Sequence, residues 1–164
     1  MFMNHVNDIN ELLKEHPNVK IRMPNMPEDI SENIIKFILR NKLRDKTTTW
    51  NTPSGDLKSK VYGKQECKCF KSDGPLTFGP TENWDVLYIL DARNFRNLVF
   101  WRVNLPNTAE EWSSLKLSKA STFADCCNQG KRPHITWNAL FPQIENHADR
   151  VYEGTFHSIF STMF

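Results

Sequence analysis

Residues 55–70 constrain the fold most, because they have the pattern of a β-hairpin that gathers charged side chains at one point. The second half of this stretch alternates polar and apolar residues. Since successive strand residues point to opposite faces, Glu66 and Lys68 are expected to project from one face. Gly63 supplies a turn before that strand, which lets Asp56 fold back beside Glu66. The pattern therefore predicts two carboxylates and an ammonium group that converge.

This grouping suits the hydrolysis of a phosphodiester. Carboxylate oxygens are the usual ligands of Mg²⁺, so Asp56 and Glu66 are candidate ligands of a metal that polarises a phosphoryl oxygen and activates a water. Lys68 is a candidate for stabilising the developing negative charge or for orienting that water. The alternative is a surface hairpin with a cross-strand ion pair, because short Glu-x-Lys patterns also arise by chance.

The length of 164 residues and the hydrophobic fraction of 39% fit one globular domain. No apolar run approaches the roughly 18 to 20 residues needed to span a bilayer, so no membrane partner is expected. The first 16 residues lack the basic start and apolar stretch of a signal peptide, which favours a cytoplasmic protein.

The formal net charge of +2 is too small to establish a nucleic-acid partner, but the basic residues are clustered. Lysines crowd residues 58–71, further basic residues occupy 40–46, and Lys131, Arg132 and His134 form a later group. Such patches can meet a phosphate backbone. The alternative is an ordinary solvated surface.

The four cysteines are Cys67, Cys69, Cys126 and Cys127, and their C-x-C and CC spacings differ from the C-x-x-C of common zinc sites. Reduced thiols packed in the interior are expected in a cytosolic protein. A zinc site that combines these thiols with His134 is the weaker alternative.

Apolar periodicity predicts helices over 1–16 and 28–43, and a short apolar run bounded by acids predicts a buried strand over 84–91. A hairpin partner follows at 97–103. Further helices are expected over 109–115, which Asn107 would cap, and over 121–129 and 137–144. Residues 76–83 and 130–135 are expected to be loops. The order favours an α/β fold with a mixed central β-sheet flanked by helices.

The whole chain, 1–164, is expected to form a single nuclease domain with three parts. These are an N-terminal helix and extended arm (1–27), a catalytic core (28–120), and a basic recognition loop with a C-terminal packing or dimer segment (121–164).

The helix at 28–43, then Asp56, then Glu66-Cys67-Lys68, then a buried strand and a helix, resemble the PD-(D/E)xK nuclease core. The likeness covers nearly the whole chain and is greatest to small type II restriction endonucleases. One departure is that Gly55 stands where the motif has a leading proline.

The resemblance implies a catalytic role for Asp56 and Glu66 as metal ligands and for Lys68 as the catalytic lysine. The metal would be Mg²⁺, with Mn²⁺ as a substitute, and the backbone carbonyl of Cys67 would complete its coordination. Glu32 becomes an accessory acid, although its position in the helix taken alone favours the surface.

Sequence reading needs side chains at base edges, where Arg and Lys suit guanine and Asn and Gln suit adenine. Two segments offer such groups, and an ordinary polar loop is the alternative for each. The candidates are Lys71, Ser72, Asp73, Thr77, Thr81, Glu82 and Asn83 in the first segment, and Asn128, Gln129, Lys131, Arg132 and His134 in the second.

The resulting hypothesis is a Mg²⁺-dependent endonuclease that cuts double-stranded DNA at a short sequence, acting as a homodimer on a palindromic site. No phosphate-cradling or dinucleotide-binding glycine motif is present, so no nucleotide cofactor is expected. The alternatives are a structure-selective repair or recombination nuclease and a non-catalytic nucleic-acid-binding protein.

Overall fold

The computed structural model describes residues 2–16, 18, 26–51, 56–94 and 96–160, without the side chains of 2–7, 10, 156 and 160. Most of the extended arm expected within 1–27, and Gly55, lie outside the described residues. The predicted N-terminal helix is confirmed as α1 (Phe2–Glu15).

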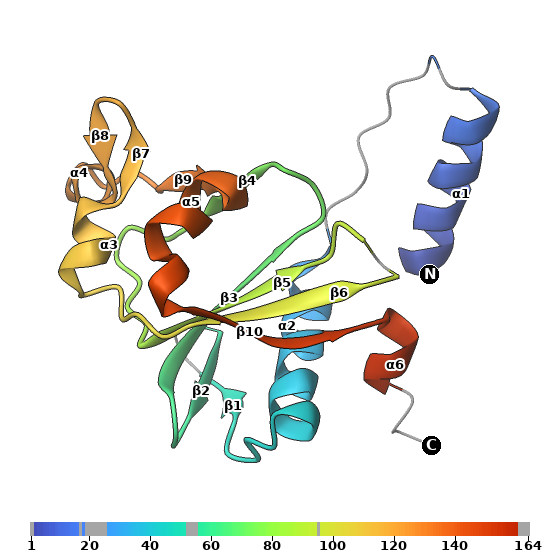
Figure 1. Ribbon diagram of the computed structural model, residues 1–164, viewed down its shortest axis with the longest axis horizontal. Helices are drawn as coiled ribbons and strands as arrows, with labels where there is room; N and C mark the ends of the chain where they lie inside the picture. The colour runs from blue at the N-terminus through green and yellow to red at the C-terminus, as the bar shows by residue number, and fades with distance from the viewer. Residues whose placement is uncertain (1, 17, 19–25, 52–55, 95, 161–164) are drawn as a thin grey trace.

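A six-stranded mixed sheet forms the centre of the fold (Figure 1). Its order is β1-β2-β3-β5-β6-β10; β3 and β5 are parallel, and the other neighbours are antiparallel. The strands are β1 (Thr49–Trp50), β2 (Leu57–Ser59), β3 (Gly63–Phe70), β5 (Val86–Asp91), β6 (Leu98–Val103) and β10 (Ala148–Gly154). The α/β prediction is confirmed, as are the strands expected within 84–91 and 97–103.

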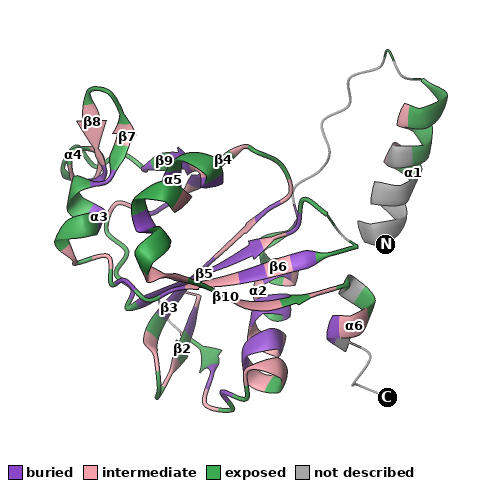
Figure 2. Cartoon of the chain, in the orientation of Figure 1, coloured by how far each residue is buried: buried purple, intermediate pink, exposed green. Residues whose placement is uncertain are grey.

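Strand β5 separates two apolar cores, because its residues alternate between the faces of the sheet. Leu87 and Ile89 pack with residues of α5 (Trp137–Ile144), whereas Tyr88 and its neighbours two positions away pack with residues of α2 (Glu28–Phe37). Figure 2 shows buried residues running along the central strands and the facing side of α2. The apolar run in the sequence reflects burial on both faces.

Helix α2 continues as a π-helical segment, Ile38–Lys42, so the predicted helix is confirmed over nearly its full length. Pro27 precedes its first turn. Two acids in that turn interact favourably with the positive end of the helix dipole. The buried stripe consists of Ile34, Ile35, Ile38 and Leu39.

Two small antiparallel ribbons lie outside the central sheet. One joins β4 (Pro75–Thr77) to β9 (His134–Thr136), and the other joins β7 (Lys116–Ser118) to β8 (Ser121–Thr122). The expectation that 76–83 and 130–135 are loops was therefore wrong at β4 and β9, because each strand supplies the backbone partner that the other lacks.

Short helices complete the chain: α3 (Glu110–Ser114), α4 (Phe123–Asn128), the 3-10 helix η2 (Glu145–His147) and α6 (Phe156–Phe160). Asn107 does not cap α3, whose N-cap is Ala109; the Asn107 side chain instead bonds the backbones of Trp84 and Glu82. Pro142 is accommodated inside α5 rather than interrupting it.

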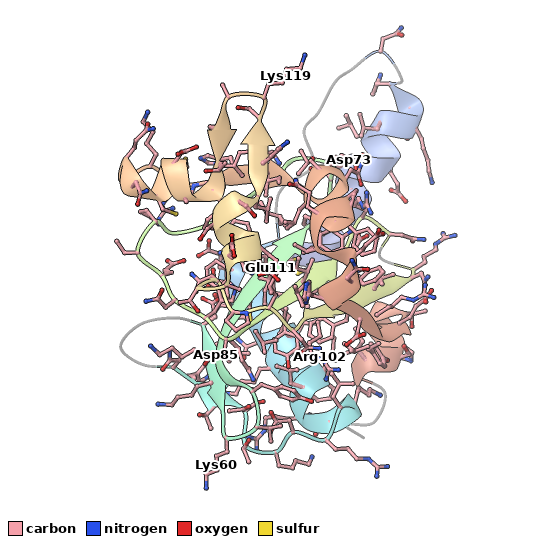
Figure 3. All side chains as sticks on the ribbon, turned by 60° about the vertical axis from the view of Figure 1, so that its left-hand side comes forward. Lys60, Asp73, Asp85, Arg102, Glu111 and Lys119 are labelled. Atoms are coloured by element: carbon pink, nitrogen blue, oxygen red, sulfur yellow. The ribbon has the colours of Figure 1, made fainter. Side chains whose placement is uncertain are left out.

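Gly63 is required at the β2–β3 turn for two reasons. Its φ of +65° lies in the left-handed region, and a Cβ there would fall 2.1 Å from Oδ2 of Asp85. That carboxylate accepts the backbone N–H of Lys64 at 2.8 Å, which fixes the start of β3 against the chain entering β5 (Asp85 is labelled in Figure 3). The turn thus sets the register on which the rest of β3 depends.

We predict that Gly63→Ala lowers the unfolding free energy by about 2 kcal/mol or more, from backbone strain and overlap with Asp85. Gly130→Ala is the matched control, because Gly130 has a φ of +66° and nothing within 4 Å of its added Cβ. This control should lose about 1 kcal/mol. Urea denaturation measures both, and equal losses would show that contact with Asp85 is unimportant.

Candidate active site

Glu66 and Lys68 project from the same face of β3, and their charged groups are in contact. Nζ of Lys68 lies 2.5 Å from Oε1 of Glu66, and the Glu66 side chain is only 5% exposed. Phe70 shares this face and packs into the core cluster that contains residues of α5. The strand thereby holds an acid and an amine two residues apart on one face, next to a residue of the core.

Asp56 immediately precedes β2 and lies against the middle of β3. Leu57 pairs with Gln65, so the register continued by one residue sets Asp56 opposite Glu66. Oδ2 of Asp56 accepts the backbone N–H of Cys67 at 2.6 Å. The expected fold-back is confirmed, whereas the chemical roles of Asp56, Glu66 and Lys68 stay predictions.

Glu32 lines the same cleft from α2, together with Asp56 and Glu66. It is half-buried rather than a free surface residue, which corrects what its helix position alone favours. Burial and the nearby charge of Asp56 raise the pKa of Glu32 to about 6. The first two turns of α2 therefore contribute an acid to the cleft.

The cleft carries more negative than positive charge. Burial raises the pKa of Glu66 to about 7, because the attraction of Lys68 is partly opposed by Asp56 and does not offset the loss of hydration. Burial also raises the pKa of Asp56, against the hydrogen bond from Cys67. For Lys68, burial alone would lower the pKa, but Glu66 and Asp56 raise it above its ordinary value. Lys68 thus stays an ammonium group.

Gln65 does not contact the charged group, although it is next to Glu66 in the sequence. It points to the other face of β3, is 2% exposed, and neither amide atom has a hydrogen-bond partner among the described residues. In the part of the chain that the structure describes, no cysteine belongs to a group of three or more His, Cys, Asp or Glu side chains that could hold a metal. Cys67 and Cys69 are free thiols in β3, and burial raises the pKa of both.

The cleft has a volume of about 590 Å³ and extends from the acids to the β4–β9 ribbon. Half of the predicted DNA-contacting residues line it, from both sequence segments. These are Lys71, Ser72, Thr77, Glu82, Arg132 and His134. The pairing of Thr77 with His134 brings together two segments that the sequence analysis treated as separate surfaces.

The other DNA-contacting candidates do not line the cleft. They are Asp73, Thr81, Asn83, Asn128, Gln129 and Lys131, all exposed. Asp73 is joined to Arg93 at 2.6 Å, and Lys131 donates to Gln129 at 2.8 Å. In the protein without DNA, these two side chains are therefore engaged in contacts within the chain.

Arg93 is a residue of this region that the sequence analysis missed. Its guanidinium bonds both oxygens of Asp91 at the end of β5, reaches Asp73 after β3, and lies 4.9 Å from the Phe70 ring centre. It therefore ties the chain leaving β3 to the end of β5. The i, i+2 pairing of Asp91 with Arg93 was the available signal.

The Bsp6I restriction endonuclease family matches residues 1–143 of this chain. The chain belongs to this family. No curated protein and no solved structure matches it. As a member of the Bsp6I family, the protein is a type II site-specific deoxyribonuclease, a sequence-specific DNA endonuclease. The family thus favours nuclease chemistry over DNA binding without catalysis.

The donor set suits the divalent metal that restriction endonucleases of this type generally use. Asp56 and Glu66 offer hard carboxylate oxygens, and protein groups poorly offset their negative charges. Among the residues that the structure describes, no three His, Cys, Asp or Glu side chains gather closely enough to hold a metal alone. Mg²⁺ is commonly held by one or two carboxylates with water and substrate phosphate, so this Bsp6I-family cleft fits it.

No helix among the described residues is long and apolar enough to cross a membrane.

In the metal-free protein, we predict that stability falls as the pH rises from about 4.5 to about 7. Folded Glu66, with a pKa of about 7 against an ordinary 4.5, binds more protons than unfolded Glu66 across this window. The unfolding free energy therefore decreases with pH, by on the order of 3 kcal/mol from Glu66. Urea denaturation in chelator at several pH values measures this slope.

Glu66→Gln should flatten that slope, and the exposed Glu145→Gln serves as its control. A pH slope that is the same in Glu66→Gln and in the wild type would contradict the assignment of the effect to Glu66.

Proposed function

We propose that this Bsp6I-family protein hydrolyses phosphodiester bonds of double-stranded DNA in a Mg²⁺-dependent reaction at the cleft of Asp56, Glu66 and Lys68. One observation carries the proposal. Two carboxylates with raised pKa values and one ammonium group meet in a cleft that is also lined by the basic residue Arg132. Such perturbed groups in a cleft mark functional sites.

Asp56, Glu66 and the Cys67 carbonyl would hold the Mg²⁺, for which Mn²⁺ can substitute. When bound, the ion supplies Lewis-acid polarisation of a phosphoryl oxygen. The protein's part is to fix the ligands. The Cys67 N–H holds one oxygen of Asp56, and the backbone pairing of β3 with β5 holds Glu66. Glu32 would act as an accessory acid from α2.

Lys68 acts as an electrostatic stabiliser and not as a general base. Glu66 and Asp56 raise its pKa, so its proton is retained at neutral pH. Its ammonium lies 5.5 Å from the centre of the Phe78 ring and 2.5 Å from Glu66, which limits its orientations. A fixed cation beside the scissile phosphate stabilises the negative charge that develops there.

DNA would be held along the rim formed by the residues that follow β3 and those of 128–134, with basic side chains on phosphates and polar ones on bases. The exposed candidates outside the cleft would contact the duplex beyond the cut site. The three-part division of the chain at 27 and 120 stays a prediction.

Mutation of the acids tests the chemistry. Asp56→Asn and Glu66→Gln should each reduce DNA cleavage in Mg²⁺ at least about 100-fold, because a ligand charge is lost. DNA affinity should be retained or increased, since negative charge is removed beside the phosphates. Digestion of phage DNA followed by sequencing of the ends, and fluorescence anisotropy in Ca²⁺, measure the two quantities.

Glu145→Gln, at an exposed acid, is the control for Asp56→Asn and Glu66→Gln. Lys68→Met, which should also abolish most cleavage, has exposed Lys119→Met as its control. Intact DNA with wild-type protein across enzyme and salt concentrations would overturn the proposal, as would full cleavage by Asp56→Asn.

We also propose a homodimer, since a two-fold protein would match a palindromic site. Sedimentation with a cognate duplex should give a protein mass of twice the 19.2 kDa chain. One chain per cleaved duplex would contradict it.

A further inference from the structure

The β4–β9 ribbon lies at the edge of the proposed catalytic cleft, and its inner face packs on the hydrophobic core. Leu76 of β4 and Ile135 of β9 form one cross-strand pair, each is 4% exposed, and both belong to the core cluster that contains Phe70. The N–H of Phe78 donates to the Pro133 carbonyl at 3.0 Å, which adds one more bond to the ribbon. The ribbon is thus held rigidly on the body of the protein.

The opposite face of the ribbon carries four side chains, of which two are polar and uncommitted to the fold. Since strand residues alternate, Pro75, Thr77, His134 and Thr136 share this outer face. Thr136 accepts the N–H of Ala139 as the N-cap of α5, and Pro75 has no polar side-chain atom. Thr77 and His134 therefore supply the polar groups of this face.

Thr77 and His134 form a cross-strand pair. Oγ1 of Thr77 lies 2.9 Å from Nδ1 of His134, and both residues line the cleft. Nε2 of His134 has no hydrogen-bond partner among the described residues. The pair fixes the orientation of the imidazole and leaves this nitrogen available to a base edge.

We propose that the β4–β9 ribbon enters the major groove of duplex DNA and that the Thr77–His134 pair reads a base there. The major groove, about 12 Å wide, admits a two-stranded ribbon and presents donors and acceptors that distinguish every base pair. Arg132, just before β9, also lines the cleft and contacts DNA beside the pair. The proposal rests on the proposed function, because it takes DNA as the ligand of this cleft.

The position of the pair predicts which bases it reads. Thr77, His134 and the catalytic acids line one cleft of about 590 Å³. Base pairs are spaced about 3.4 Å along the duplex. The bases read by the ribbon therefore lie within a few base pairs of the cut phosphate.

The test is to compare cut sites in a library of duplexes in which the positions of the recognition sequence are randomised. Thr77→Val and His134→Ala should each lower the preference for the cognate base by about 10-fold or more at the same base pair. The double variant should lose little more than either single one, because the two side chains act as a unit. Thr77→Ser, which retains the hydroxyl group, should keep the preference.

The β7–β8 ribbon provides a matched control. Its Ser118 and Ser121 hydroxyls also form an exposed pair, at 2.9 Å, but neither residue lines the cleft. Lys119, at the turn of this ribbon, projects to solvent (Figure 3). Ser118→Ala and Ser121→Ala should therefore leave every base preference unchanged.

Thermal unfolding of each variant checks that it is folded, and competition between cognate and non-cognate duplexes in Ca²⁺ measures discrimination without cleavage. Unchanged base preference in folded Thr77→Val and His134→Ala would overturn the ribbon assignment, while wild-type cleavage would still support the proposed function. Absence of DNA cleavage by the wild type would instead overturn the proposed function itself.

Discussion

Burial of negative charge on β3 is the constraint to which the rest of the structure responds. Glu66 is 4% exposed, and its pKa is raised to about 7. The charged form of Glu66 is therefore less stable in the folded protein than it is in water. A chain selected for stability alone would place an apolar residue there. Leu87 and Ile89 of the neighbouring strand β5 are fully buried, so the surrounding core supplies the stability that this position removes. Binding of a divalent cation would reverse the disadvantage by stabilising the charged form.

The geometry of this site depends on backbone pairing more than on side-chain contacts. Glu66 and Lys68 are held because β3 pairs with β5 on one side and with β2 on the other. Asp56 is held because Cys67 donates its N–H to the Asp56 side chain. A one-residue slip of β3 would turn Glu66 and Lys68 to the opposite face. Two hydrogen bonds between Asp85 and the backbone of Lys64, at the start of β3, oppose such a slip.

The sequence was sufficient where the relevant pattern is local. Alternation in β3, the glycine at its turn and the apolar run of β5 each reflect one element and its immediate neighbour, so the strands and the fold-back of Asp56 could be predicted. The β4–β9 ribbon could not, because its strands have three residues each and Thr77 lies 57 positions from its partner His134. Strand β10 was missed since this edge strand, with sequence ADRVYEG, is half-exposed and mixes charged with apolar residues.

Glu32 shows a different limit, because helix periodicity gives the face of a side chain but not what that face meets. Only the docking of α2 beside β3 turns a half-buried helix acid into part of the cleft. Asp73 is the converse case. A polar residue after β3 suits base contacts, yet its partner Arg93 comes from beyond β5 and could not be assigned from local sequence.

Thr77 and Phe78, which are adjacent in the chain, connect the proposed recognition of DNA with its proposed cleavage. Thr77 pairs with His134 on the outer face of the ribbon, and the next residue, Phe78, turns its ring inward toward the Lys68 ammonium. The same ring stacks on Trp84 and contacts Trp112 edge-on, so it is fixed by the aromatic core. Because strand residues alternate, one strand end can present the proposed reading group to DNA and a support to the proposed catalytic lysine at adjacent positions. This arrangement would place recognition and cleavage in one cleft.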